Sequence, residues 1–258
     1  MIIFLVVAHL VMGFLGTLFI NIFADLISEQ QKNLIFMLVA GIANLLVVIF
    51  FYIKLSSRKI KEIFIEKNNC GSVKHYLAVI LLVIGTGNII TKIFEIIDFV
   101  PEDLFYEETF FVLSEFKFWI GFLLVVLLPS VLEEIIFRGI ILNELLKDYS
   151  AKFAIVFSAF LFGAFHLDFR QGLAAFFLGV ILGWLYWRYK SLFLVMFAHA
   201  FNNFLGLVGI HMLGNMEDGS LDVATETQPM GVTFFGILLF GIGLFICLND
   251  DSVQRNID

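Results

Sequence analysis

The sequence predicts an all-α fold, a polytopic bundle of about eight transmembrane helices that forms one integral membrane domain over residues 1–258. Three observations predict it: the composition, the length of the apolar runs and the polar breaks between them. Of the 258 residues, 60% are hydrophobic and only 15% are charged, whereas a soluble domain is roughly half apolar and about a quarter charged. A soluble fold cannot bury so much apolar surface.

Each apolar run is long enough, or nearly so, to cross a bilayer, which takes about 20 mostly apolar residues. The runs cover residues 2–26, 34–54, 76–97, 117–147, 152–168, 172–189, 191–212 and 230–249. The first run has no basic segment before it and is long enough to be a retained helix rather than a short cleavable signal. The fourth run exceeds one bilayer thickness and contains Pro129, which predicts a helix that is bent, tilted or extended beyond the lipid.

The charged loops predict how the helices are oriented. Basic residues gather in the loop at residues 54–74, and acidic residues gather in the loop at residues 102–115. The excess of Lys and Arg in cytoplasmic loops places the first loop inside and the second outside, so that both termini are cytoplasmic. The formal net charge of −7 comes from a few loops and no basic stripe is present, which argues against a nucleic-acid partner.

Polar and ionisable residues lie within three of the apolar runs. Each charge inside a membrane segment costs at least about 2.5 kcal/mol, so such groups are usually paired or functional. The candidate site residues come from the fourth, fifth and seventh runs, and they are Glu133, Glu134, Arg138, His166, His199 and Asn203.

Helical spacing limits what these side chains can do. Glu134 and Arg138 are four residues apart, which places them on one helix face as an ion pair. Glu133 is rotated by about 100° from Glu134, so one glutamate can be structural while the other faces a reaction centre. His199 and Asn203 are also four residues apart and project from a single face.

The turn between the fourth and fifth runs sets the depth of the polar residues. Glu133 lies fourteen residues before Lys147, and His166 lies fourteen residues after Lys152. Antiparallel helices joined by that turn bring the two side chains to a similar height. His199 is about nine residues from its own turn. Its depth therefore differs from that of Glu133 and His166 by about 7 Å, at about 1.5 Å per residue, and a bend or tilt of the helix would absorb this difference.

A carboxylate, two imidazoles and an amide are the groups that hydrolysis of a peptide bond by water requires. A glutamate takes a proton from water, a histidine positions that water, and neutral donors stabilise the oxyanion. The same groups could hold a divalent metal that activates a bound water, and spacing alone does not separate the two. The structural alternative is that these groups form only a buried ion pair and interhelical hydrogen bonds. This alternative requires that the motifs on three helices lie in register by coincidence.

The motifs resemble those of a known family. EExxxR at residues 133–138, FxxxH at residues 162–166 and HxxxN at residues 199–203 occur in this order on successive hydrophobic helices. They resemble the CPBP family of intramembrane proteases, the CAAX-protease and bacteriocin-processing family also called Abi, which includes the type II CAAX prenyl endopeptidases. The stretch from Phe177 to Arg188, followed by Ser191 and Leu192, is also similar, and the resemblance covers roughly residues 129–205 within the catalytic core helices at 117–212.

The resemblance implies a role for each residue. Glu133 would be the general base that activates water, with His166 assisting. His199 and Asn203 would stabilise the oxyanion, and Glu134 with Arg138 would shape the site. Family members have been described both as metalloproteases and as glutamate proteases.

We favour a glutamate mechanism without a metal cofactor, because no close HExxH-type pair is present. Zinc, if used, would be bound by Glu133, His166 and His199. The expected substrate is a membrane-associated peptide or protein, and the expected location is the cell membrane, by preference a bacterial plasma membrane. The alternative is a non-catalytic relative that acts in bacteriocin immunity, as a scaffold or as a transporter-like binder.

Overall fold

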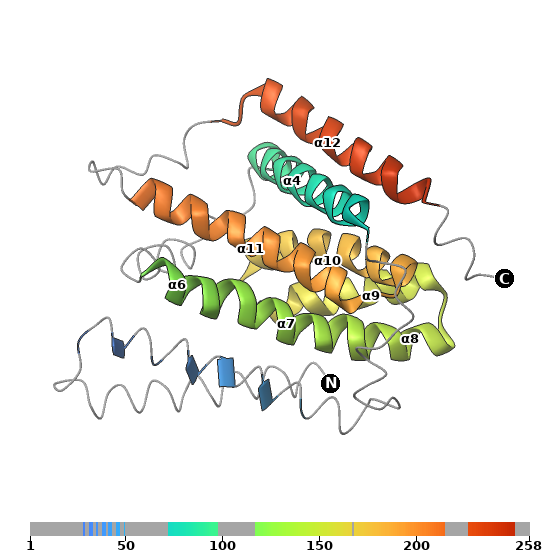
Figure 1. Cartoon of the computed structure of the whole chain (residues 1–258), viewed down its shortest axis with the longest axis horizontal. Coiled ribbons are helices and arrows are strands. Elements are labelled where there is room, and N and C mark those ends of the chain that lie inside the picture. The colour runs from blue at the N-terminus through green and yellow to red at the C-terminus, as the bar shows by residue number, and fades with distance from the viewer. Residues whose placement is uncertain are drawn as a thin grey trace.

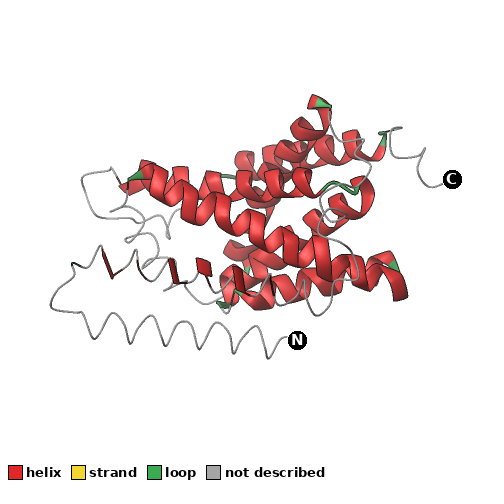
Figure 2. Ribbon diagram, turned by 60° about the horizontal axis from the view of Figure 1, so that its bottom comes forward, coloured by secondary structure: helices red, strands yellow, loops and turns green. Residues whose placement is uncertain are grey.

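The computed structural model describes residues 72–97, residues 117–214 except residue 167, and residues 227–250, together with single residues between 28 and 49. Every regular element in these ranges is a helix, which confirms the predicted all-α class (Figures 1 and 2). The first predicted run and most of the second lie outside the described residues, as do most of the loops used for orientation. Eight spans, the sidedness and the single domain over 1–258 therefore stay predictions.

In the part of the chain that the structure describes, five helices are long and apolar enough to cross a membrane. They are α4 (Val73–Ile96), the continuous helix Phe118–Asp148, α10 (Phe169–Tyr189), most of α11 (Leu192–Gly214) and α12 (Met230–Leu248). Each corresponds to one of the predicted apolar runs. The predicted run at 152–168 is α9 (Ala151–Phe165), which has 15 residues and is shorter than the roughly 20 that a full span needs. The described part thus has the composition and helix lengths of a multi-pass membrane protein.

The helix Phe118–Asp148 carries the first motif and is not uniform along its length. It is built from α6 (Phe118–Gly121), the π-helical segment η1 (Phe122–Leu127), α7 (Leu128–Glu134), the π-helical segment η2 (Ile135–Leu142) and α8 (Asn143–Asp148). Pro129 is the second residue of α7, and α7 directly follows η1. The wider π-helical turn accommodates the proline, whose ring would otherwise collide with the preceding turn. The helix therefore continues through Pro129.

α9 and α10 form a closely packed hairpin beside this helix. A Cβ atom at Gly163 would lie 2.5 Å from the carbonyl oxygen of Gly172, and one at Gly183 would lie 3.2 Å from Cγ2 of Ile155. These glycines permit the close approach of α9 and α10. Gly206 does not, because a Cβ there would have no described atom within 4 Å.

α12 packs along α4, and α4 in turn contacts α10 and α11 (Figure 1). Hydrogen bonds and ion pairs join the two helices at both ends. At one end the backbone N–H of Gln228 donates to Glu95 over 2.6 Å. At the other end the buried carboxylate of Asp250 contacts the His75 imidazole and accepts from Nζ of Lys74 over 2.7 Å. Neither pair was predicted from the sequence.

Candidate active site

The first motif lies where α7 passes into η2, in the interior of the bundle. Glu133, Glu134 and Arg138 retain only 6%, 0% and 1% of their surface exposure. Removing such charges from water is costly unless each has a partner of opposite charge or a hydrogen bond. The partners therefore determine how this group is held.

Oε1 of Glu134 joins the first and third motifs. It accepts from Nη1 of Arg138 over 2.8 Å and lies 2.9 Å from Nδ1 of His199. Since the carboxylate is the acceptor, Nδ1 of His199 carries a proton in this contact. The pairing of Glu134 with Arg138 that the four-residue spacing predicted is confirmed.

The other nitrogen of the same imidazole faces the second glutamate. Nε2 of His199 lies 3.9 Å from Oε2 of Glu133, which is too long for a direct hydrogen bond. His199 therefore contacts both glutamates of the motif, through its two ring nitrogens. Glu133 and His199, from helices far apart in the sequence, meet inside the bundle.

Arg138 is held from three directions. Besides Glu134, its Nη2 donates to the carbonyl oxygen of Gly179 over 3.0 Å, and its guanidinium carbon lies 4.7 Å from the centre of the Phe162 ring. A Cβ at Gly179 would lie 3.1 Å from Ala159 and from Phe162. The absence of a side chain at Gly179 thus lets α10 approach α9 beside the guanidinium.

Phe162 lies against both histidines. Its ring contacts His199 edge-on at 5.6 Å between centroids, and it contacts His166 edge-on at 5.0 Å. Nδ1 of His166 hydrogen-bonds the carbonyl oxygen of Phe162, over 2.9 Å, at the end of α9. No hydrogen bond or ion pair among the described residues links His166 to Glu133 or His199. The structure brings His166 to the same region, but in contact with Phe162.

Asn203 faces the same long helix as His199 but contacts a different part of it. Its Nδ2 donates to the carbonyl oxygen of Val125 over 3.1 Å, and its Oδ1 accepts from Nδ2 of Asn202 over 3.3 Å. The backbone carbonyls of Val125 and Gly179 were not predicted as site groups, because a carbonyl is present at every residue and has no signal of its own.

The metal ligands considered from the sequence were Glu133, His166 and His199. Within the described ranges, no three His, Cys, Asp or Glu side chains gather as the ligands of one metal ion would.

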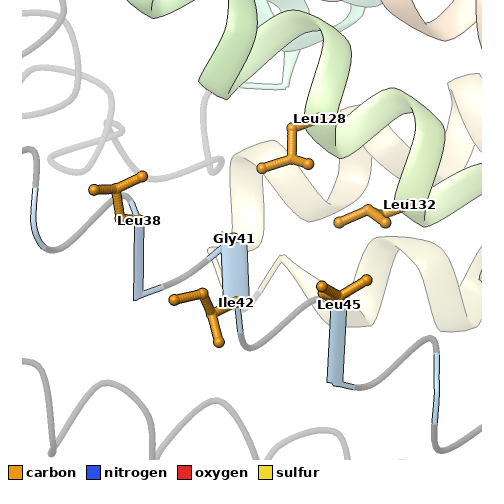
Figure 3. Close-up of a pocket in the computed structure, with 6 residues that line it drawn as sticks. All are labelled: Leu38, Gly41, Ile42, Leu45, Leu128 and Leu132. Carbon is orange, nitrogen blue, oxygen red and sulfur yellow. The ribbon is translucent and has the colours of Figure 1, made fainter.

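An apolar pocket of about 180 Å³ lies against α7 near the first motif. Figure 3 shows Leu128 and Leu132 of α7 on one side of it, with Leu38, Ile42 and Leu45 on the other. Leu132 directly precedes Glu133 in the chain. The surface beside the candidate site is therefore aliphatic.

Part of the chain matches a known protein family. Residues 115–205 match the family model described as type II CAAX prenyl endopeptidase Rce1-like. The matched segment contains all six candidate site residues, and the resemblance predicted from the motifs is confirmed over this region. Neither the curated proteins nor the solved structures gave a match.

Proposed function

We propose that this protein is an intramembrane endopeptidase in which Glu133 activates water to hydrolyse a peptide bond of a membrane-associated peptide or protein. Two findings support the proposal, the Rce1-like match over residues 115–205 and the apolar spanning helices that carry the motifs. The observation that carries it is the buried carboxylate of Glu133, 3.9 Å from an imidazole nitrogen of His199.

The proposed reaction uses His199 as a hydrogen-bond donor through both ring nitrogens. Glu133 and Glu134 carry two negative charges, and Arg138 supplies one positive charge. A proton on His199 makes the set neutral, which lowers the cost of burying it. Because Glu134 holds Nδ1, the proton on Nε2 is available to an incoming group beside Glu133.

The proposed reaction begins with a water molecule hydrogen-bonded to Glu133. The carboxylate takes one proton, the water oxygen forms a bond to the peptide carbonyl carbon, and the carbonyl oxygen becomes an oxyanion. Nε2–H of His199 and the amide of Asn203 donate to that oxyanion. When the C–N bond breaks, the protonated Glu133 returns its proton to the leaving amine, which leaves a carboxyl product and a free amine.

For His166 we propose an assisting role through Nε2, because Nδ1 is occupied by the carbonyl of Phe162. This histidine would orient the water or the substrate, while Glu133 makes the proton transfer. Glu134 and Arg138 contact no reacting atom in this scheme. They would act by holding the His199 imidazole.

The aliphatic pocket beside α7 supports a substrate with an apolar group near the cleaved bond. Its lining residues come from α7 and from the second apolar run. An extended apolar segment that reaches Glu133 along this surface would stay within the hydrocarbon region of the bilayer. We place the protein in the cell membrane, by preference that of a bacterium.

Cleavage assays on the purified protein test the proposal. Fluorogenic peptides with apolar flanks would be offered to the wild type and to Glu133→Gln in lipid nanodiscs. Loss of the general base should slow cleavage by about 10²- to 10⁴-fold. Glu144→Gln is the matched control, because Glu144 lies on the same helix, is partly exposed and pairs with Lys147.

Cleavage by Glu133→Gln at the wild-type rate would refute the mechanism. A chelator tests the metal alternative in the same assay: a loss of activity that added zinc restores would count against glutamate-activated water without a metal. Tight binding of peptides that the wild type never cuts would instead identify a non-catalytic binder.

A further inference from the structure

The π-helical segment η2 determines which side chains of the long helix can face α10. In an α-helix successive residues are rotated by about 100°, so residues five apart point about 140° away from each other. In a π-helix each N–H bonds to the carbonyl five residues earlier, so residues five apart lie on nearly the same side. Arg138 and Asn143 are five apart, and the chain between them is π-helical up to Leu142. The two side chains can therefore face the same neighbouring helix.

Arg138 and Asn143 both form hydrogen bonds with α10. Nη2 of Arg138 donates to the carbonyl oxygen of Gly179 over 3.0 Å. Nδ2 of Asn143 donates to the hydroxyl oxygen of Tyr186 over 2.6 Å. Gly179 and Tyr186 are seven residues apart, or about two α-helical turns, so they lie on one face of α10. The π-helical rotation of η2 thus matches two donors of the long helix to one face of its neighbour.

Asn143 also stabilises the end of η2, where α8 begins. Its backbone N–H bonds to the carbonyl of Ile140, whereas in an α-helix it would bond to that of Gly139. The Gly139 carbonyl instead accepts from Nδ2 of Asn143 over 3.0 Å. One amide nitrogen therefore uses its two protons on the backbone of η2 and on the Tyr186 hydroxyl. Asn143 and Tyr186 are both buried, where a polar group without a partner is costly.

We propose that Asn143 is a positioning residue for the reaction: bonded to Tyr186 and to the end of η2, it holds the helix rotation in which Arg138 reaches α10. This inference rests on the proposed function. Asn143 contacts no reacting atom in the scheme. Its effect passes through Arg138 to Glu134, and from there to the His199 imidazole.

Asn143→Leu tests the inference because it removes both bonds of the amide and keeps a side chain of similar size. We expect kcat to fall by about ten- to a hundredfold, since small displacements of a positioned group have effects of this size, with KM changed less than about twofold. Tyr186→Phe removes one oxygen and keeps the ring, and it should also lower kcat, but by less. An unchanged kcat in either variant, or a loss confined to KM, would overturn the inference.

Two control variants make similar changes away from η2. Asn249→Leu removes a local bond of the same kind, from Nδ2 of Asn249 to the carbonyl of Phe245, at the exposed end of α12. Tyr189→Phe removes a hydroxyl of α10 that faces the Cys247 carbonyl of α12. Neither control should change kcat, and a loss in them as large as that in Asn143→Leu would overturn the inference.

Combination with Arg138→Met separates positioning from a general structural role. Because Asn143 acts through Arg138, Asn143→Leu should lower kcat by less than about twofold in a protein that already carries Arg138→Met. Losses that multiply would show two independent effects and would overturn the inference.

Thermal denaturation keeps the inference separate from the proposed function. Arg138→Met should lower the melting temperature less in the Asn143→Leu background than in the wild type, because the bond to Gly179 is already weakened there. The same reduction should appear in the Tyr186→Phe background, which remains a test if Asn143→Leu does not fold. In the Asn249→Leu background the full loss should remain. Equal losses in all backgrounds would overturn the inference. This test needs no cleavage, so a protein that cuts no peptide would refute the proposed function alone.

Discussion

Replacing Arg138 by methionine tests how the buried charges are held. The change removes the bond to Glu134, the bond to the Gly179 carbonyl and the contact with the Phe162 ring, and it leaves the Glu134 carboxylate without its cationic partner. Breaking a buried ion pair in this way costs about 3–5 kcal/mol. At about 2–4 °C per kcal/mol for a protein of this size, the melting temperature should fall by roughly 6–20 °C.

Removing both charges should restore most of that loss. In Glu134→Gln combined with Arg138→Met, no charge is left unpaired, and the glutamine oxygen can still accept from Nδ1 of His199. Cleavage should nevertheless stay about a hundredfold or more below the wild type, because a neutral amide stabilises a protonated imidazole less than a carboxylate does. Stability and activity therefore separate in this variant.

Thermal denaturation followed by the fluorescence of the three tryptophans measures the stability, and the peptide assay measures the activity. Lys147→Met is the matched control on the same helix. It breaks a pair whose side chains are 45% and 28% exposed and should cost less than about 1 kcal/mol. The reasoning fails if Arg138→Met is as mild as this control, or if the double variant is less stable than the single one.

Three further changes follow from the packing. Gly179→Ala places a methyl group 3.1 Å from two side chains of α9 and should cost about 1–3 kcal/mol of stability, with a loss of cleavage. Gly206→Ala meets no described atom within 4 Å and should stabilise α11 by about 0.5–1 kcal/mol; equal melting temperatures for the two would contradict the packing. Asp250→Ala removes the contacts with Lys74 and His75 and should lower the melting temperature without changing kcat, and a large loss of kcat would show that these contacts act on the site.

The helices and the first motif follow from local sequence rules. Runs of apolar residues predict spanning helices because the bilayer sets their length, and α4, α10, α11 and α12 lie where the runs predict them. The contact between Glu134 and Arg138 follows from the pitch of a helix alone. Such features can be predicted without knowing which helices are neighbours.

Features that depend on neighbouring helices were predicted less well. The depth argument brought Glu133 and His166 to one height, but depth does not fix rotation about the helix axis, and His166 hydrogen-bonds the Phe162 carbonyl instead of a glutamate. The contact between His75 and Asp250 joins positions 175 residues apart, and no spacing rule relates them. Asp250 lies beyond the last apolar run, where sequence reasoning treats an acid as solvated.

The contacts of His199 explain why the motif has two adjacent glutamates. Side chains at successive helix positions point about 100° apart, so Glu133 and Glu134 face different directions from one backbone. The two nitrogens of one imidazole reach both of them, at 2.9 Å from Glu134 and at 3.9 Å from Glu133. A change at Arg138 therefore acts first on Glu134, then on the orientation and charge of the ring, and only through the ring on the space beside Glu133. The supporting pair and the proposed base are separate in role but are joined by one side chain from α11.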